Sequence, residues 1–162
     1  MFQPITEAEV ARILVRRKFV HKVVEDNTKP KGPVQPFEKR FVCDIRFVDM
    51  PAAAVQLQFF ARQEQAISGV LPRPLPGLSL LWRGVRIRGV NWAWRHDSLL
   101  HGVQQGHIKG WHEKVWTNSD GDKHIKDING EVKNTDLPTM IKFCCDRWNI
   151  EFKDDQFRLG GT

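Results

Sequence analysis

The sequence predicts an α+β fold: a single curved antiparallel sheet of five to seven strands, with an N-terminal and a C-terminal helix packed on it. Two observations support this fold class. Apolar residues recur at helical spacing near both ends of the chain, and they alternate with polar residues in the segments between. A run of strands flanked by helices is typical of an antiparallel sheet that carries its helices on one face.

Length and composition indicate one domain that covers residues 1–162. The chain has 162 residues, a formal net charge of +6 and a pI of about 9.5, which is within the usual size of a single domain. No apolar run approaches the ~18 residues of a membrane span, and no secretory signal pattern is present. The three cysteines do not make a disulfide framework. We therefore expect a cytoplasmic protein with no membrane partner.

Each terminal helix has a start signal and an apolar stripe. The first is predicted to begin at Thr6, which forms a Thr-x-x-Glu capping box with Glu9. The second is predicted to begin near Asp136, and a short strand at Ile150 follows it. The stripes that should pack on the sheet contain Val10, Ile13 and Leu14 in the first helix, and Leu137, Met140, Ile141, Cys144 and Trp148 in the second.

The middle of the chain alternates with period two, which predicts strands. The expected strands are 19–25, 41–48, 55–62, 78–82, 85–94, 108–117 and 123–128. Residues 19–25 could instead extend the first helix, and 78–82 with 85–94 could be one long bent strand. The strands 41–48 and 55–62 are expected to form an antiparallel hairpin around the turn at 49–51. Two proline-rich segments, 26–36 and 68–77, are predicted loops. The apolar phase shifts at Gly89, where we expect a β-bulge. Pairing across the Asp120-Gly121 turn would place His124 opposite Thr117.

Histidine is concentrated in one stretch, because five of the six histidines lie between residues 96 and 124. This stretch is predicted to run from the end of one strand, through a glycine-flanked loop at 102–106, into the next strand. Trp111 is expected to face the core there. His112 and Lys114 would then face solvent or a cleft, because neighbouring side chains in a strand point to opposite faces.

A metal site is one use for these side chains, since imidazole and carboxylate groups are common metal ligands. Their spacing matches no tight zinc motif. Residues 118–122 resemble the start of a calcium loop, but Lys123 occupies the position where that loop requires glycine. We therefore predict neither a metal nor another cofactor.

Metal-independent cleavage of RNA is a second use. Two imidazoles can act as general base and general acid while a 2′-hydroxyl attacks its own phosphate, and a cation stabilises the charge that develops on the phosphoryl oxygens. The candidate catalytic residues are His101, His107 and His112, and the candidate phosphate-binding residues are Arg95, Lys109 and Lys114. Glu113 is a weaker candidate, because its side chain should face away from that of His112.

Binding of nucleic acid without chemistry is a third use, because basic and aromatic residues share the central region. Cations can bind phosphate groups while indole rings stack on bases. The residues concerned are Arg83, Arg86, Arg88, Arg95, Lys109 and Lys114, together with Trp82, Trp92, Trp94, Trp111 and Trp116. Most tryptophans in strands lie in the core, so only a minority of these indole rings is expected at the surface.

One sequence pattern is similar to that of a known family. Between a strand and a final amphipathic helix the chain carries, in order, Arg95, Asp97, His101, Ile108, Gly110 and His112. This order, over roughly residues 80–150, resembles small prokaryotic toxins of the TumE type and related uncharacterised proteins of mobile elements. Members often carry paired histidines in the second strand. Here Glu113 follows His112, so the resemblance implies that His101 or His107 supplies the second imidazole.

These observations predict a small cytoplasmic protein that acts on nucleic acid, as a toxin-like, metal-independent ribonuclease with RNA as its partner. The alternative prediction is a non-enzymatic module that binds a protein, either a host protein or an antitoxin-like partner. In that alternative, binding would depend on exposed aromatic residues and not on the three candidate histidines.

Overall fold

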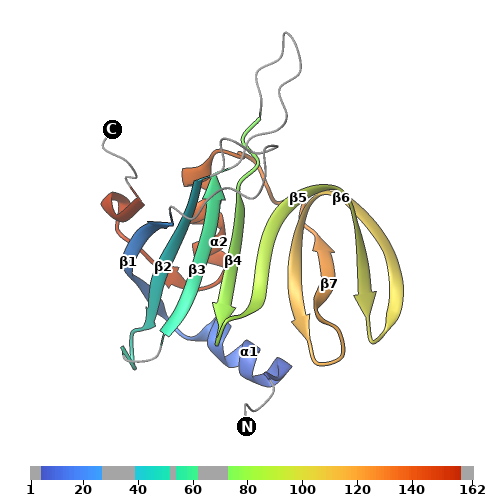
Figure 1. Ribbon diagram of the computed structural model, residues 1–162, viewed down its shortest axis with the longest axis horizontal. Coiled ribbons are helices and arrows are strands. Elements are labelled where there is room, and N and C mark those ends of the chain that lie inside the picture. Colours follow the sequence, from blue (N-terminus) through green and yellow to red (C-terminus); the bar gives the residue numbers. More distant parts are fainter. Residues whose placement is uncertain (1–4, 27–38, 52–53, 62–72, 158–162) are drawn as a thin grey trace.

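The computed structural model describes residues 5–26, 39–51, 54–61 and 73–157 and shows one continuous sheet (Figure 1). Its eight strands lie in the order β7-β6-β5-β4-β3-β2-β1-β8. Neighbours are antiparallel from β7 to β1, and β8 is parallel to β1. The elements are α1 (Glu7–Val15), β1 (Lys18–Asp26), β2 (Lys39–Phe47), β3 (Ala54–Ala61), β4 (Gly77–Trp82), β5 (Val85–Leu100), β6 (Val103–Thr117), β7 (Gly121–Asp127), α2 (Leu137–Arg147), β8 (Ile150–Glu151) and a 3₁₀ turn (Asp154–Phe157).

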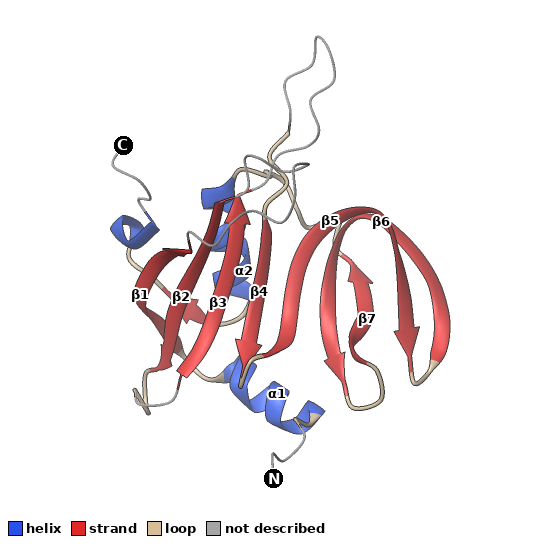
Figure 2. Ribbon diagram, in the orientation of Figure 1, coloured by secondary structure: helices blue, strands red, loops and turns tan. Residues whose placement is uncertain are grey.

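The prediction of an antiparallel sheet of five to seven strands is wrong. The number of strands, the direction of the last strand and the shape of the sheet all differ from it. The described residues are mostly sheet: eight strands form one mixed sheet that curls into a half-barrel, and two α-helices accompany it (Figure 2). Alternation in the sequence could not decide whether 78–94 forms one strand or two. It also carries no information on the direction in which β8 pairs with β1.

The N-terminal elements follow the local signals in the sequence. Thr6 caps α1, because its side chain accepts a hydrogen bond from the Glu9 backbone N–H. The Glu9 carboxylate accepts instead from the Trp82 indole N–H at 3.0 Å, so only half of the predicted capping box forms. The helix ends where Lys18 is buried, with its ammonium donating to the carbonyls of Ile13 and Arg16. Residues 19–25 lie in strand β1 and do not extend the helix, and their β-branched valines favour this conformation.

The predicted hairpin of 41–48 and 55–62 is confirmed as β2 and β3, and the strands on both sides of the Asp120-Gly121 turn are confirmed as β6 and β7. Of the two predicted proline-rich loops, residues 27–36 and 68–72 lie outside the described residues, and Gly77, the last residue of the second, begins β4. The bulge in β5 is at Ile87, where the pairing with β4 shifts register, and not at Gly89. His124 pairs with Val115 and not with Thr117, because an irregularity near the turn shifts the register.

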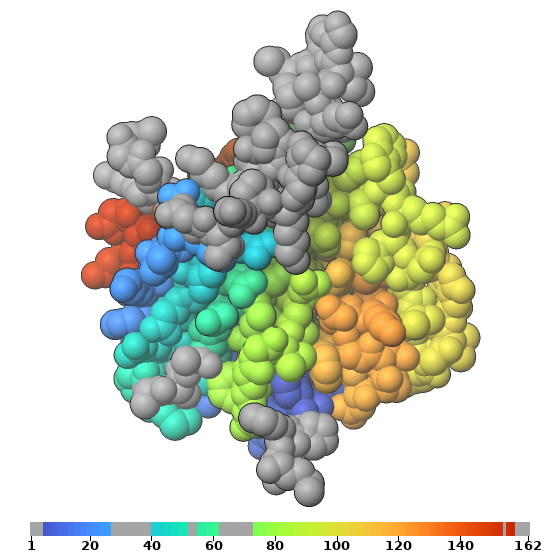
Figure 3. Space-filling view, viewed as in Figure 1, coloured from blue at the N-terminus to red at the C-terminus, as the bar shows by residue number. Residues whose placement is uncertain are grey.

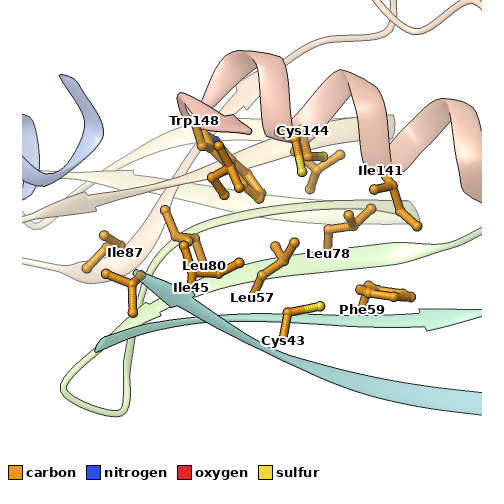
Figure 4. Packing of buried hydrophobic residues seen from close by; sticks show 14 of the residues in the cluster. Cys43, Ile45, Leu57, Phe59, Leu78, Leu80, Ile87, Ile141, Cys144 and Trp148 are labelled. Atoms are coloured by element: carbon orange, nitrogen blue, oxygen red, sulfur yellow. The ribbon is translucent and has the colours of Figure 1, made fainter. Parts of the chain in front are cut away.

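The hydrophobic core lies between one face of the sheet and α2, and Figure 4 shows the close packing there. Asp136 caps α2 by accepting from the Thr139 backbone N–H, and the predicted apolar stripe faces the sheet. α2 carries the chain from β7, at one edge of the sheet, to β8, at the other. Among the described residues, neither α-helix combines the length and the apolar character needed to cross a membrane.

Candidate nucleic-acid interface

The candidate site lies on the hairpin of the two longest strands, β5 with 16 residues and β6 with 15. Their pairing is interrupted between Ala93 and His96 and again between Asp97 and Leu99. Each such irregularity bends a strand and increases its twist, and the hairpin arches over instead of extending straight from the sheet (Figure 1). Strand β7 (orange) then lies beside β5 (yellow-green), as Figure 3 shows.

The hairpin turn consists of only two residues, His101 and Gly102, so the predicted loop at 102–106 is wrong. Leu100 pairs with Val103, and the turn residues have φ angles of 52° and 75°. Positive φ at both central positions is the geometry of a type I′ turn, which matches the twist of paired strands. The glycine at the second turn position was the available sequence signal.

Hydrogen bonds close the end of this hairpin onto β7 and the β6–β7 turn. The Ser98 hydroxyl accepts from the Ile125 backbone N–H at 3.1 Å and lies 3.4 Å from the Ile125 carbonyl oxygen. The Asp120 carboxylate accepts from the Gly102 backbone N–H at 3.1 Å. Strands β5, β6 and β7 therefore enclose an interior of their own.

His112 lies inside this enclosure, so the prediction that it faces solvent or a cleft is wrong. The side chain is fully buried. Its Nδ1 is 3.1 Å from the Gly110 carbonyl oxygen, and its Nε2 is buried without a partner among the described residues. Burial lowers the pKa of His112 to about 4, and the positive charges near it add to that effect. The imidazole is neutral near pH 7 and has no access to a substrate.

His96 is the histidine that the structure brings to His112, with their ring centroids 4.7 Å apart. The pairing changes from Ala93 opposite Gly110 to His96 opposite Ile108. This adds one residue to β5 and turns His96 to the face that His112 occupies. No sequence pattern indicates this pair, because the irregularity that creates it is not visible in the sequence.

The other two candidate histidines lie apart from this pair. His101 is in the turn and exposed, and His107 is exposed in β6, where it pairs with Asp97 of β5. The only histidine ring contact that the described part of the chain records is between His96 and His112. The three predicted catalytic residues are therefore not brought together as one cluster.

An exposed aromatic and basic surface occupies the same hairpin. Trp94 is 67% exposed, and its ring packs edge-on against that of Trp92 with centroids 4.9 Å apart. The Lys109 ammonium lies 4.8 Å from the Trp94 ring centroid, and the Arg73 guanidinium lies 5.6 Å from that of Trp92. We call these four residues the tryptophan surface. Arg73 was missed because it lies in a segment predicted only as a loop.

The three predicted phosphate-binding residues occupy different places. Lys109 belongs to the tryptophan surface. Arg95 is exposed in the neighbouring irregular part of β5, where it forms an ion pair with Asp97 at 3.4 Å. Lys114 is five positions from Lys109 along β6, so alternation puts it on the opposite face of the sheet. Of these three residues, Lys109 is the one that contacts Trp94.

Glu113, the weaker catalytic candidate, is a buried structural residue. Its carboxylate accepts from the Trp148 indole N–H at 2.9 Å and from the Arg147 guanidinium at 3.0 Å. Both partners lie at the C-terminal end of α2. No sequence signal linked Glu113 to these residues, because 34 positions separate it from Arg147.

No three histidine, cysteine, aspartate or glutamate side chains of the described residues come together as a metal site. No family model matches the chain. No curated protein and no solved structure gives a significant match. The function is therefore inferred from the geometry of the hairpin.

Proposed function

We propose that this protein binds single-stranded RNA through the tryptophan surface. The observation that supports this most directly is Trp94, a large apolar ring that is 67% exposed and held by contacts to Trp92 and Lys109. Exposed rings beside cations suit single strands, because bases stack on the rings while the cations bind the backbone phosphates. The net charge of +6 would favour the approach of a polyanion.

The alternative, a surface that binds a protein, also uses exposed aromatic residues. The charges distinguish the two proposals. Both cations of the tryptophan surface lie within 5.6 Å of an indole ring centroid. A neighbouring cation and ring match the alternating phosphates and bases of RNA better than they match an apolar protein patch.

Replacing Trp94 by Ala should weaken RNA binding strongly. Stacking of a base on an aromatic side chain contributes about 1–3 kcal/mol, so the Kd should rise roughly 5- to 150-fold. Fluorescence anisotropy of a labelled oligouridine, titrated with protein between about 50 and 200 mM salt, measures this. Lys109→Gln should make the salt dependence less steep by about 0.7 in the log–log slope, the contribution of one phosphate contact.

The matched control is Val103→Ala, which removes another exposed apolar side chain of the same hairpin, 61% exposed. This variant should bind RNA as the wild type does. A blunt RNA duplex is the second control, because its bases are not available for stacking. If Trp94→Ala binds oligouridine as tightly as the wild type while its circular dichroism is unchanged, the proposal is wrong.

Cleavage of the bound RNA is the second candidate function, and the exposed imidazoles of His101 and His107 on the same hairpin favour it. His101 in the turn and His107 in β6 are separated by several residues of extended strand, so a single imidazole would act on a given phosphate, as general base for the 2′-hydroxyl. Loss of the acting group should lower the cleavage rate about 100-fold, so His101→Ala and His107→Ala are the variants to assay on a gel. His112→Gln should keep wild-type activity. Equal activity in all variants would show that the cleavage comes from a contaminating nuclease.

A further inference from the structure

A small polar crevice lies on the face of β5 and β6 opposite to Trp94 and Lys109. Its cavity volume is about 30 Å³, and it is lined mainly by Phe60, Ser79, Arg86, Gly89, Asn91 and Lys114. A water molecule needs roughly 10–15 Å³ on this measure. The crevice therefore has room for the outer oxygens of one small anion, and the remainder of a ligand would lie in solvent.

The cationic side chains of Arg86 and Lys114 both line this crevice, next to Gly89. A Cβ on Gly89 would lie 3.1 Å from the Cδ of Arg86, so the missing side chain leaves space for the arginine stem. Burial, and then the neighbouring Arg86, lower the pKa of Lys114, which shows that the two cations share one partly desolvated space. Like charges held this close destabilise each other.

The carboxylates of the described residues do not balance these charges. Asp122 forms an ion pair with Arg86 at 3.3 Å, and no described carboxylate lies within 4.0 Å of the Lys114 ammonium. One carboxylate, that of Asp122, therefore lies beside two cationic side chains, and the crevice carries a net positive charge.

Unpaired polar atoms lie beside the two cations. Arg86 Nε and Asn91 Oδ1 are buried and have no hydrogen-bond partner among the described residues. A buried guanidinium N–H without an acceptor costs free energy, and an anion in the crevice would supply one. The Asn91 amide can turn over, which would replace the unpaired oxygen by an N–H₂ donor.

We propose that Arg86, Lys114 and Asn91 bind the phosphate group of a small phosphorylated ligand. Two cationic donors and one amide donor match the oxygens of a tetrahedral oxyanion. The size of the crevice admits a terminal phosphate but not the base or sugar attached to it. This site is independent of the RNA-binding proposal, because it uses the other face of the hairpin and none of the residues of the tryptophan surface.

Titration of the ¹⁵N-labelled protein with inorganic phosphate, and in parallel with ribose 5-phosphate, tests the site at constant ionic strength. The backbone amides of Gly89, Asn91 and Lys114 should shift and saturate. Lys114→Met keeps the aliphatic stem and removes the charge, so its Kd should be roughly tenfold higher or more. Lys126→Gln, which removes an exposed cation of β7, is the matched control and should bind as the wild type does.

Saturation by both probes would support a site for the terminal phosphate of a larger ligand, and saturation by inorganic phosphate alone would support a site for the free ion. Shifts that do not saturate, or that are equal in the wild type and Lys114→Met, would overturn the proposal. Arg86→Gln provides a second test of the same donors. Lys114→Met should bind oligouridine as tightly as the wild type, so failure of this site and failure of the RNA proposal are distinguishable.

Discussion

Replacing Glu113 by Leu should lower the free energy of unfolding by about 3–5 kcal/mol, the usual cost of removing one partner from a buried ion pair. Glu113 is 5% exposed and accepts from both Arg147 and Trp148. Burial lowers the pKa of Arg88, and Glu113 is the charge that opposes this effect. Without Glu113, the Trp148 N–H is unpaired in the core, and Arg88 and Arg147 repel each other while Arg147 keeps only the half-exposed Glu131 as a partner.

Urea unfolding followed by circular dichroism measures this loss. Glu131→Gln is the matched control, because Glu131 also accepts from Arg147, at 2.9 Å, but is half exposed. An exposed ion pair contributes about 0–1 kcal/mol, so this variant should unfold almost as the wild type does. If Glu113→Leu were no less stable than Glu131→Gln, the carboxylate would not be the link between β6 and α2.

Acidification should destabilise the fold through His112, by about 3 kcal/mol between pH 6.5 and pH 4. Burial lowers the pKa of His112 from 6.5 to about 4 in the folded protein. Between these values the unfolded chain binds a proton that the folded chain does not bind, so a fall in pH favours unfolding. The stability is fully present above about pH 6.5 and declines until about pH 4, because each pKa unit corresponds to about 1.4 kcal/mol.

The comparison of wild type with His112→Gln isolates this effect from the other groups that titrate. Both proteins keep His96 and Lys114, the two basic side chains that act on the pKa of His112. The variant should lose less stability between pH 7 and pH 4 in urea unfolding experiments. The control is His107→Gln, which removes an exposed imidazole and should retain the wild-type slope. Identical slopes for wild type and His112→Gln would mean that the folded protein can protonate His112.

Local signals in the sequence predicted most of the single elements. The cap at Thr6, the cap at Asp136 and the Asp120-Gly121 turn each depend on residues close together in the chain, and each was confirmed. The same local reasoning mistook the glycines at 102 and 106 for a loop. Strand pairing continues through these residues, and the reversal needs only the His101-Gly102 turn.

The candidate site was predicted less well because its geometry depends on contacts between distant residues. Alternation correctly put His112 and Trp111 on opposite faces, but a curled sheet covers both faces at this point. The closure depends on Ser98 reaching Ile125, and that hydrogen bond has no signature in the sequence. The exposure of Trp94 has the same origin, since its environment is set by irregular pairing in β5.

The position of α2 and β8 has a consequence for folding kinetics. The last strand pairs with the first, with Ile150 opposite Lys18, so one of the final contacts joins residues separated by most of the chain. Such contacts carry a large loop-closure cost and are typical of slowly folding proteins. Until α2 has been synthesised, the apolar face around Leu57 and Leu80 lacks the cover that this helix provides, and the growing chain must persist in that state before the core can form.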